Sequence, residues 1–488
     1  MNAGRSSRRE FIVSTSLAGV WLATTRSIAQ FTDPTGLSIT EAARLIRSGD
    51  LSPVSLVRAY LERIQRLNDR LNAFITVTTE PALAQARQLE SELASGMWRG
   101  PLHGIPIGLK DNIDTAGILT TAASAVLAGR RPDEDAEVVR RLKEAGAIIL
   151  GKLNMHEFAF GATSAITNAG PVHNPWDLAR IPGGSSGGSG AAVAARLCAG
   201  ALGTDTGGSV RIPSAHCGIV GLKPTYGLVS TRGVIPVSVS LDHVGPMCRT
   251  VGDAALMLQA MAGYDSLDIT SIEADLPNFV AAMQSRTSGL RLGVPREPFY
   301  DNLDPQIEEA VGSALEVLGG LTTGIDDVEL PPRPEVPLVS AEAMAYHAPL
   351  IEEKRELYDP NTLTRIMRGV DYPATDYVRG THQLELARKA IARVFESVDL
   401  LVTPTLSRLP IRIDEAQKTP FDDTLSRNTG VFNVYGVPSI SLPCGFSSEG
   451  LPIGLQISGP ALGELDVLAL AHAYEQATDW HERVPPLA

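Results

Sequence analysis

The sequence predicts one large α/β domain in which a central mixed β-sheet is sandwiched between helices. Short apolar segments such as 147–150 and 400–402 alternate with longer segments that have helical periodicity. The 488 residues are 44% hydrophobic and 20% charged, which is enough apolar material for a sizeable core. No internal repeat or shift in composition marks a boundary beyond the first 30 residues. We therefore expect a single domain over residues 30–488, with a mobile or elaborated segment at about 265–380.

Capping residues and apolar spacing predict the elements of the first 150 residues. Ser52 and Pro53 are typical of a helix start, and the apolar residues that follow recur at helical spacing. The predicted helices cover residues 39–47, 53–71, 81–94 and 135–145, and the predicted strands cover 72–77, 104–110 and 147–150.

The second half of the chain continues the same alternation. An alanine-rich helix follows the glycine run at 183–188, and Thr250 caps a helix that ends at Gly263. Turn residues are frequent between about 265 and 337, where only 291–294 is expected as a strand. The remaining prediction is two long helices near 340–358 and 376–398, strands at 400–402, 439–442 and 455–457, and a last helix ending at 478.

Residues 1–29 have the organisation of an export signal. Ser7-Arg8-Arg9-Glu10-Phe11-Ile12 resembles the twin-arginine motif, an apolar run covers 11–23, and the small residues Ser27 and Ala29 suit cleavage before residue 30. The apolar run is shorter than the roughly 20 residues that span a bilayer, although an uncleaved anchor and a disordered tail are the alternatives. We expect a periplasmic or secreted protein, exported folded, without stable membrane insertion once the signal is removed.

Charge and the metal-binding residue types exclude several classes of function. The formal charge is −13, and the first 29 residues carry +3, which leaves −16 for the rest and disfavours nucleic acid as a partner. The nine histidines show no metal-ligand spacing, so we expect no metal and no cofactor. The four cysteines form no CxxC pair and are expected to be buried thiols: Cys198, Cys217, Cys248 and Cys444.

Two glycine-rich segments stand on either side of the alanine-rich helix. Residues 183–189 read GGSSGGS and residues 203–209 read GTDTGGS. Glycine allows positive φ angles and close approach of other groups, so the two segments suggest a cavity wall. Each supplies hydroxyl groups and a row of backbone N–H groups, which are the components of acyl transfer. Upstream, Lys110 ends the apolar segment 104–110.

Four blocks in this order resemble the amidase signature family of serine hydrolases. They are GIPIGLKDN at 104–112, PGGSSGGS at 182–189, GTDTGGSVR at 203–211 and GLKPT at 221–225. The resemblance extends from about residue 38 to 478, with a signature core at about 100–250. It implies the fold of that family, a Ser–cis-Ser–Lys triad and hydrolysis of an amide C–N bond through an acyl-enzyme.

By position, the resemblance implies Ser209 as nucleophile, Ser185 as bridging serine after a cis Gly184–Ser185 bond, and Lys110 as base. It also implies an oxyanion hole made by the backbone N–H groups of residues 206–209, namely Thr206, Gly207, Gly208 and Ser209. A lysine acts as a base only when neutral, yet its ordinary pKa is near 10.4. Function near neutral pH therefore needs a pKa lowered by about 3 units, or roughly 4 kcal/mol, through burial. Asp205 and Arg211 are expected to be a structural pair that shapes the second glycine loop.

The expected substrate is a small-molecule carboxamide or anilide, converted to a carboxylate and ammonia or an amine. Segments 155–163 and 428–435 and the helices at 340–398 are expected to form the pocket wall. Met155, Gly161 and Phe432 are the pocket candidates, and an apolar or aromatic acyl group is expected. The amidotransferase branch of the family usually has an aspartate near Ser426, where this chain has serine. The sequence does not indicate the oligomeric state, and a homodimer is one alternative.

Two alternative functions remain open at this point. Gly183–Gly187 is also a GxSxG pattern, so an α/β-hydrolase esterase would use Ser185 with a downstream histidine such as His347, His382, His472 or His481. That alternative gives Lys110 and the second glycine loop no role. A non-catalytic periplasmic solute-binding protein is the other alternative, and it would have no use for a complete triad. In the amidase hypothesis the histidines near the blocks are structural, namely His103, His156 and His243.

Overall fold

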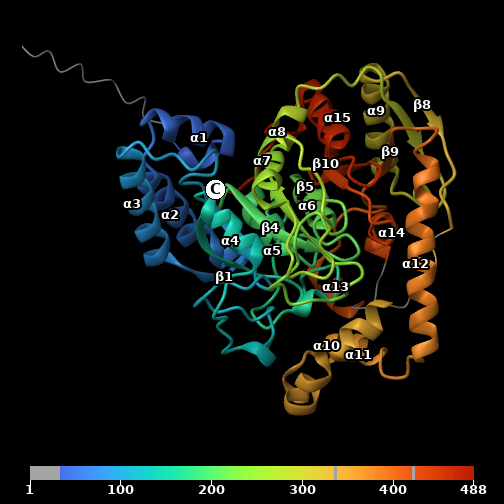
Figure 1. The fold of residues 1–488 in the computed structure, drawn as a ribbon, viewed down its shortest axis with the longest axis horizontal. Helices are drawn as coiled ribbons and strands as arrows, with labels where there is room; N and C mark the ends of the chain where they lie inside the picture. The colour runs from blue at the N-terminus through green and yellow to red at the C-terminus, as the bar shows by residue number, and fades with distance from the viewer. Residues whose placement is uncertain (1–32, 333, 335–337, 420–423, 488) are drawn as a thin grey trace, which may run out of the picture. The chain divides into compact units, whose positions relative to one another are not determined.

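An eleven-stranded mixed sheet runs through the described part of this computed structural model, in the order β1-β3-β2-β4-β6-β5-β10-β11-β9-β7-β8 (Figure 1). The structure describes residues 33–332, 334, 338–419 and 424–487. The strands are β1 (Phe74–Val77), β2 (Pro106–Lys110), β3 (Ile148–Leu153), β4 (Gly200–Asp205), β5 (Val220–Lys223), β6 (His243–Cys248), β7 (Arg291–Val294), β8 (Gly324–Asp327), β9 (Leu400–Pro404), β10 (Ser439–Phe446) and β11 (Pro452–Ser458).

The sheet has parallel and antiparallel parts. Strand β2 pairs in parallel with β3 and β4, and β7 pairs in parallel with β8 and β9. The central strands β4, β6, β5, β10 and β11 pair antiparallel. Every residue of β2, β3 and β4 is buried, as expected for strands covered on both faces. The catalytic candidate Lys110 is thus the last residue of a fully buried strand.

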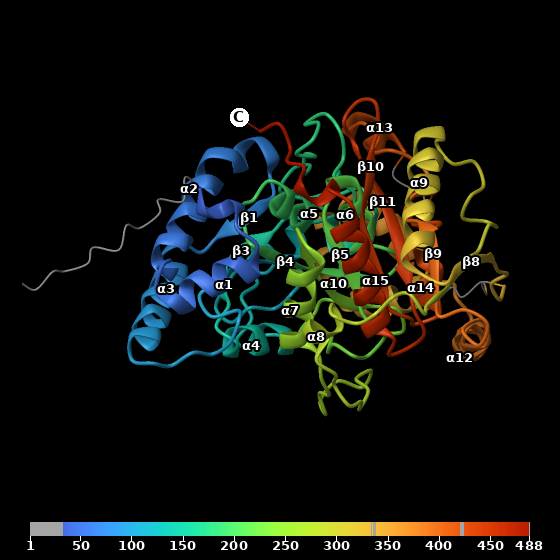
Figure 2. The ribbon, with the colours of Figure 1, turned by 90° about the horizontal axis from the view of Figure 1, so that it is seen from above.

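Helices cover both faces of the sheet. Helices α5 and α6 pack against β2, β4, β5 and β10, whereas α7, α9 and α15 pack on strands of the central region, and α15 also contacts α7 and α9. Figure 2 shows α7, α8 and α15 side by side. The helices are α1 (Ile39–Ser48), α2 (Pro53–Leu71), α3 (Thr79–Ala94), α4 (Glu137–Glu144), α5 (Gly187–Ala194), α6 (Arg211–Cys217), α7 (Val251–Met261), α8 (Phe279–Ala282), α9 (Pro305–Leu321), α10 (Leu338–Lys354), α11 (Pro360–Met367), α12 (Ala374–Val394), α13 (Ile413–Lys418), α14 (Gly430–Val434) and α15 (Glu464–Ala477).

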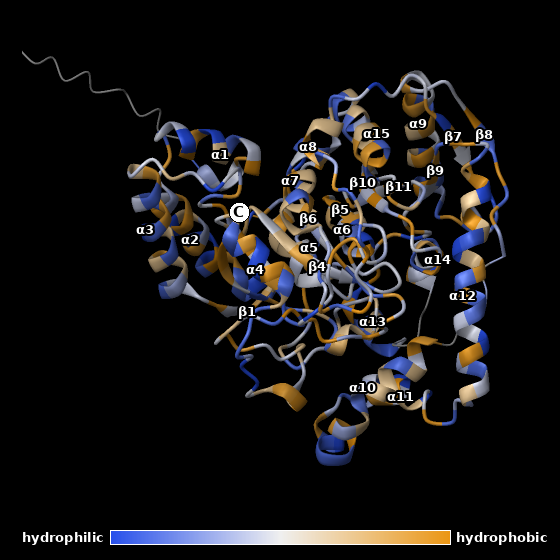
Figure 3. Cartoon of the chain, viewed as in Figure 1, coloured by the Kyte–Doolittle hydropathy of each residue, from blue (hydrophilic) through white to orange (hydrophobic). Residues whose placement is uncertain are grey.

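The first helices form because their ends are capped and one face of each is apolar. Ser38 makes a capping box with Glu41 at the start of α1, and Ser52 caps α2 with Pro53 in its first turn. Figure 3 shows alternating hydrophilic and hydrophobic bands on the outer helices α2, α3 and α12, the pattern of helices with one buried face. Helices α2 and α3 pack on each other and on β2 and β3 respectively, whereas α12 contacts α10 and α14.

The predicted fold class is confirmed: this is a single α/β domain with a large mixed sheet between helices. The prediction was wrong about two parts. Helix α9 occupies a segment expected to consist mainly of turns, and the strands β4, β5 and β6 were not anticipated. The four cysteines are buried and unpaired, as expected.

The predicted export signal lies outside the described residues. The described residues from Asp33 onward form one compact unit. Within the described residues, the helices are all too short or too polar to cross a bilayer.

Candidate active site

Lys110 lies at the carboxyl end of β2 with no exposed surface. Its Nζ donates hydrogen bonds to Ser185 Oγ at 2.7 Å and to Thr204 Oγ1 at 2.7 Å, and it lies 3.5 Å from the Thr204 carbonyl. In the described part of the chain, no carboxylate oxygen lies within ion-pair distance of this amine. Burial therefore lowers the pKa of Lys110 to about 7, although the more distant charges of Asp242 and Asp205 act in the opposite direction. The lysine can be neutral near physiological pH.

Ser185 is held against Lys110 by its backbone. The Gly184–Ser185 peptide bond is cis, which confirms the prediction. The Ser185 carbonyl accepts hydrogen bonds from the His156 N–H at 3.0 Å and from Ser164 Oγ at 3.2 Å. A Cβ at position 184 would lie 2.8 Å from the backbone nitrogens of Thr163 and Ser164, so only glycine fits before Ser185.

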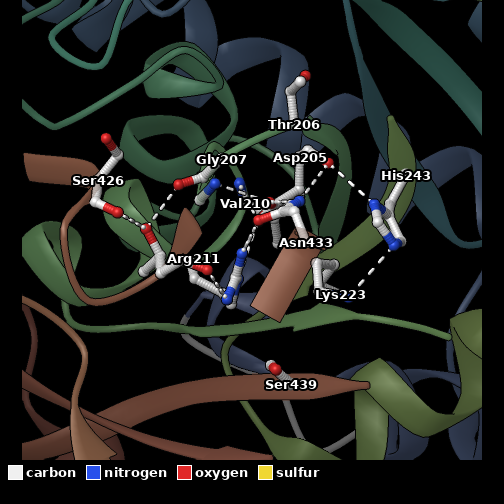
Figure 4. A network of polar contacts seen from close by, with 12 residues as sticks. Asp205, Thr206, Gly207, Val210, Arg211, Lys223, His243, Ser426, Asn433 and Ser439 are labelled. Atoms are coloured by element: carbon white, nitrogen blue, oxygen red, sulfur yellow. Dashed lines mark hydrogen bonds and ion pairs between the residues drawn. The ribbon is translucent and has the colours of Figure 1, made fainter. Parts of the chain in front are cut away.

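The second glycine loop is fixed by the carboxylate of Asp205, the last residue of β4. Asp205 accepts hydrogen bonds from the backbone N–H groups of Gly208 at 2.8 Å and Val210 at 3.1 Å. The guanidinium of Arg211 binds the same carboxylate through two nitrogens, at 3.0 and 2.9 Å, with both side chains fully buried (Figure 4). Burial alone would raise the pKa of Asp205, but Arg211 outweighs it and holds that pKa below its usual range. The expected structural pair is confirmed.

Asn433 and Gln456 complete this buried network. Asn433 Nδ2 donates to Asp205 Oδ1 at 2.8 Å, and its Oδ1 accepts from Arg211 at 2.7 Å. Arg211 also donates to Gln456 Oε1 at 2.8 Å. Since α14 carries Asn433 and β11 carries Gln456, the loop between β4 and α6 is joined to distant parts of the chain. Every charged group in the network has a partner, so the loop is held rigidly.

Ser209 is half-buried and lines a cavity next to this loop. Its carbonyl accepts from the Ser186 N–H at 3.3 Å, which joins the two glycine segments directly. Among the described residues, the Ser209 hydroxyl makes no hydrogen bond, so none joins it to Ser185 Oγ. The structure thus shows Lys110 hydrogen-bonded to Ser185 and Ser209 at the cavity surface. The transfer of a proton between the Ser209 and Ser185 hydroxyls stays a prediction.

The predicted oxyanion donors divide into two groups. The Gly208 N–H donates to Asp205 and is therefore not available to a substrate, which corrects the prediction for that residue. In the described structure the N–H groups of Thr206, Gly207 and Ser209 make no hydrogen bonds, and these three residues line the cavity. Gly208 serves the loop differently: its φ is +132°, and a Cβ there would lie 2.1 Å from Thr429 Oγ1.

The cavity next to Ser209 has a volume of about 280 Å³ and a wall of mixed polarity, to which apolar side chains and the arginines Arg365 and Arg368 contribute. Gly161 lines it, as predicted, and so does Phe160. The prediction was wrong for Met155 and Phe432, because both side chains are fully buried in apolar clusters and do not face the cavity. The residues around the cavity are Ala159, Phe160, Gly161, Ala162, Thr206, Gly207, Ser209, Ile212, Val237, Leu241, Val339, Ser340, Arg365, Arg368, Ser426, Gly430 and Val434.

Sequence reasoning missed two residues that shape the site. Thr204 binds Lys110 through its hydroxyl, and no sequence signal sets this threonine apart from others in the block. Asp242 accepts a short hydrogen bond from Thr206 Oγ1 and further bonds from the N–H groups of Val237 and Ser238. Burial raises the pKa of Asp242 to about 6 despite these hydrogen bonds.

The histidines take structural roles, as expected in the amidase hypothesis. His243 Nδ1 lies 2.7 Å from the Leu241 carbonyl, and its Nε2 lies 3.3 Å from Lys223 Nζ (Figure 4). His103 Nε2 contacts the Leu89 carbonyl at 2.9 Å, and His347 pairs with the Tyr358 hydroxyl at 2.9 Å. Within the described residues, no histidine hydrogen-bonds the hydroxyl of Ser185 or Ser209. The geometry therefore does not support a Ser–His hydrolase.

Comparison with known proteins agrees with this geometry. The family model described as Amidase matches residues 55–468. The glutamyl-tRNA(Gln) amidotransferase A subunit of Gloeobacter violaceus is 41% identical over 481 residues, covering 92% of this chain and 98% of its own. A solved structure of 6-aminohexanoate cyclic dimer hydrolase has a TM-score of 0.86 at 30% identity, covering 93% of this chain and 99% of its own. The peptide amidase PAM, solved with the inhibitor chymostatin, has a TM-score of 0.80 at 32% identity, with coverages of 92% and 99%.

Proposed function

We propose that this chain, which belongs to the amidase family, hydrolyses the C–N bond of small linear amides through an acyl-enzyme on Ser209. Cleavage of an amide C–N bond is the activity that the family match and the similar structures support. The observation that carries the finer assignment is the buried contact of Lys110 with Ser185, next to a loop that presents Ser209 to a cavity.

In the proposed reaction, Ser209 Oγ attacks the amide carbonyl carbon and forms a C–O bond. The proton of Ser209 passes to Ser185 Oγ, while the proton of Ser185 passes to the neutral amine of Lys110. The oxyanion faces the N–H groups of Thr206, Gly207 and Ser209. When the C–N bond breaks, the same proton returns through Ser185 to the leaving nitrogen. Water then attacks the acyl-enzyme by the same relay and releases the carboxylate.

The cavity wall supports an apolar acyl group. Phe160, Ile212, Val237, Leu241 and Val434 surround the space next to Ser209. No aspartate or glutamate is among the residues that line this cavity in the described structure, so a carboxylate partner for a substrate amino group is missing from its wall. These features favour an aromatic or aliphatic amide over an amino-acid amide.

The relatives that are amidotransferase A subunits suggest a second candidate, release of ammonia from glutamine within a complex. The identity of 41% over nearly their whole length favours it. Ser426 lies in the cavity wall where that branch is expected to have an aspartate, which argues against glutamine. Ammonia release from benzamide-type amides and from glutamine, compared at equal concentration, distinguishes the two candidates. Faster release from the benzamide-type amides favours the amidase, and faster release from glutamine favours the second candidate.

The decisive experiment is active-site labelling by a fluorophosphonate, mapped by peptide mass spectrometry. We expect the adduct on Ser209, with labelling abolished by Ser209→Ala and strongly slowed by Ser185→Ala or Lys110→Ala. An adduct on Ser185 would indicate the esterase alternative, and a protein that neither labels nor hydrolyses any amide would indicate a binding protein. His347→Ala is the matched control for the esterase alternative and should still label.

We also propose that residues 1–29 direct export through the twin-arginine pathway, so that the mature enzyme is periplasmic or secreted. The motif around Arg8 and Arg9 supports this proposal. Replacing both arginines with lysine should retain the protein in the cytoplasm, with the signal uncleaved, as read by cell fractionation. A homodimer is proposed as its oligomeric state, to be measured by light scattering of the mature chain.

A further inference from the structure

A second cavity of about 410 Å³ lies at the end of α6 remote from Ser209. It is bounded by the segment before α1, the end of α6 and the residues after α15. Its wall shares no residue with the cavity that Ser209 lines. The residues around it are Gly36, Ser38, Glu41, Trp176, Ala194, Arg196, Cys217, Gly218, Ile219, Arg249, Thr250, His481, Glu482, Arg483, Val484 and Pro485.

Arg249 is the first cation of this cavity and follows directly after β6. Its Nη2 donates to the carbonyl oxygens of Leu37 and Gly36, whereas its Nη1 is buried without a hydrogen-bond partner. Within the described residues, Arg249 forms no ion pair closer than 4.0 Å. A guanidinium in this position therefore keeps its full charge, with carbonyl dipoles as its direct partners.

Arg196 is the second cation and has an unusual backbone. Its φ is +58°, a left-handed conformation that side chains other than glycine and asparagine seldom adopt. Its side chain makes no hydrogen bond or ion pair with the described residues, and its Nε is buried. Burial lowers the pKa of Arg196, and the charge of Arg249 lowers it further, so the two guanidinium groups are close enough to repel each other.

We propose that the cavity bounded by Arg196, Arg249 and His481 binds a small oxyanion, that is, a phosphate or carboxylate group. Two guanidinium groups that face one cavity without a paired carboxylate are costly unless an anion joins them. The planar fork of arginine N–H donors matches the oxygens of carboxylate and phosphate in a bidentate manner.

Asp253 and Asp33, whose charges act on these arginines, have other partners and do not line the cavity. Asp253 accepts hydrogen bonds from the backbone N–H groups of Ile39 and Thr40, at the start of α1. Asp33 accepts from the N–H and hydroxyl of Thr35. Their charges raise the pKa of Arg249 and of Arg196 respectively, but from beyond ion-pair distance. Within the described residues, neither carboxylate therefore forms an ion pair with Arg196 or Arg249.

The two glutamates that line the cavity, Glu41 and Glu482, do not neutralise the charges of Arg196 and Arg249 either. Glu41 is exposed and accepts from the N–H and hydroxyl of Ser38 as the cap of α1. Glu482 is exposed, and Arg483 beside it lies over the rings of Phe446 and Trp480. The cavity wall therefore carries three arginines, Arg196, Arg249 and Arg483, against the two glutamates, in a chain whose overall charge is −13.

Calorimetric titration of the mature protein with inorganic phosphate tests the proposal, and malonate in a second titration distinguishes a phosphate from a carboxylate ligand. Sodium chloride keeps the ionic strength constant throughout. We expect saturable binding at one site for at least one anion, accompanied by a rise in Tm. Arg196→Gln should weaken that binding at least tenfold. Since the Arg196 side chain makes no hydrogen bond, this variant should fold with an unchanged or higher Tm in anion-free buffer.

Arg393→Gln is the matched control, because Arg393 is an exposed arginine on α12 that does not line the cavity. It should bind the anion as the wild type does. Arg249→Lys keeps the charge but loses the fork, and it should also weaken binding if the variant folds. Equal binding by the wild type and Arg196→Gln would overturn the proposal. So would an absence of saturable binding, or a Tm rise that sodium chloride alone reproduces.

Discussion

Lys110 Nζ and Ser185 Oγ lie 2.7 Å apart in a region from which solvent is excluded. This contact joins the end of β2 to the turn before α5, two segments 75 positions apart in the chain. It also explains the lowered pKa of Lys110, since its hydrogen-bond partners are the uncharged oxygens of Ser185 and Thr204. A base that is neutral near pH 7 and touches a serine hydroxyl is what the proposed relay needs.

Removing the amine should abolish most of the activity. Lys110→Ala is expected to lower kcat by about 10²–10⁴-fold, the usual contribution of a general base. Steady-state ammonia release measures this effect, with circular dichroism to verify folding. Lys152→Met is the control, because Lys152 is equally buried but donates to Ile113 and Thr120, away from the serines. A similar loss of kcat in a folded Lys152→Met variant would contradict the role of Lys110.

The pH profile should report Lys110 directly. Because the lysine must be neutral and its pKa is about 7, kcat/KM should rise with pH through about 7 and then level off. The negative charge of Asp242 raises the pKa of Lys110, so Asp242→Asn should move this rise to lower pH. Initial rates between about pH 5 and pH 11 test both statements. A rise near pH 10 in the wild type would show that the lysine is not desolvated.

Breaking the buried ion pair should destabilise the protein more than breaking an exposed one. Arg211→Met leaves Asp205 as an uncompensated buried charge and is expected to cost about 3–5 kcal/mol. Because the folded-state pKa of Asp205 is lowered below 3.8, the contribution of the pair is present above about pH 4 and is lost as the pH falls. Urea unfolding at pH 7 and at about pH 2.5, below the ordinary pKa of an aspartate, measures it. Arg379→Met on the surface of α12 should cost less than about 1 kcal/mol.

Adding one methyl group to the second glycine loop should impair catalysis. Gly208→Ala would bring a Cβ within 2.1 Å of Thr429 Oγ1 at a φ of +132°, so the loop must shift and displace the Thr206 and Gly207 N–H groups. We expect kcat to fall by about 10²-fold or more, as for loss of an oxyanion donor. Gly312→Ala, which has open space in α9, should keep full activity. Equal activities of the two variants would disprove the role of the loop.

Two phenylalanines should separate substrate binding from folding. Phe160 lines the cavity, so Phe160→Ala should raise KM for aromatic amides with a smaller effect on kcat. Phe432 is fully buried against Phe299, so Phe432→Ala should cost about 3–5 kcal/mol of stability. Its KM should be unchanged below its Tm. Steady-state kinetics and thermal unfolding of both variants test this assignment. A raised KM in Phe432→Ala together with a destabilised Phe160→Ala would contradict it.

Elements with strong local signals were predictable. The helix start at Ser52 and Pro53 appears where expected, and a strand forms at 106–110 within the predicted segment 104–110, because capping and periodicity act within a few residues. Strand β4 (GALGTD) and strand β6 (HVGPMC) carry glycine and proline, which disfavour strands. They form because neighbours on both sides of the sheet pair with them and helices bury them, which is information that no local window contains.

For the site, the amino-acid sequence alone determined which residue types meet: two serine-bearing glycine loops, a lysine after an apolar strand, and the pair of Asp205 and Arg211. Only the tertiary structure decided that Thr204 completes the contacts of Lys110, that Gly208 N–H belongs to Asp205, and that Met155 and Phe432 are core residues. An apolar residue has the same spacing pattern whether it faces a core or a cavity, and a backbone N–H has no sequence signature for its partner. Both depend on which segments, far apart in the chain, pack together.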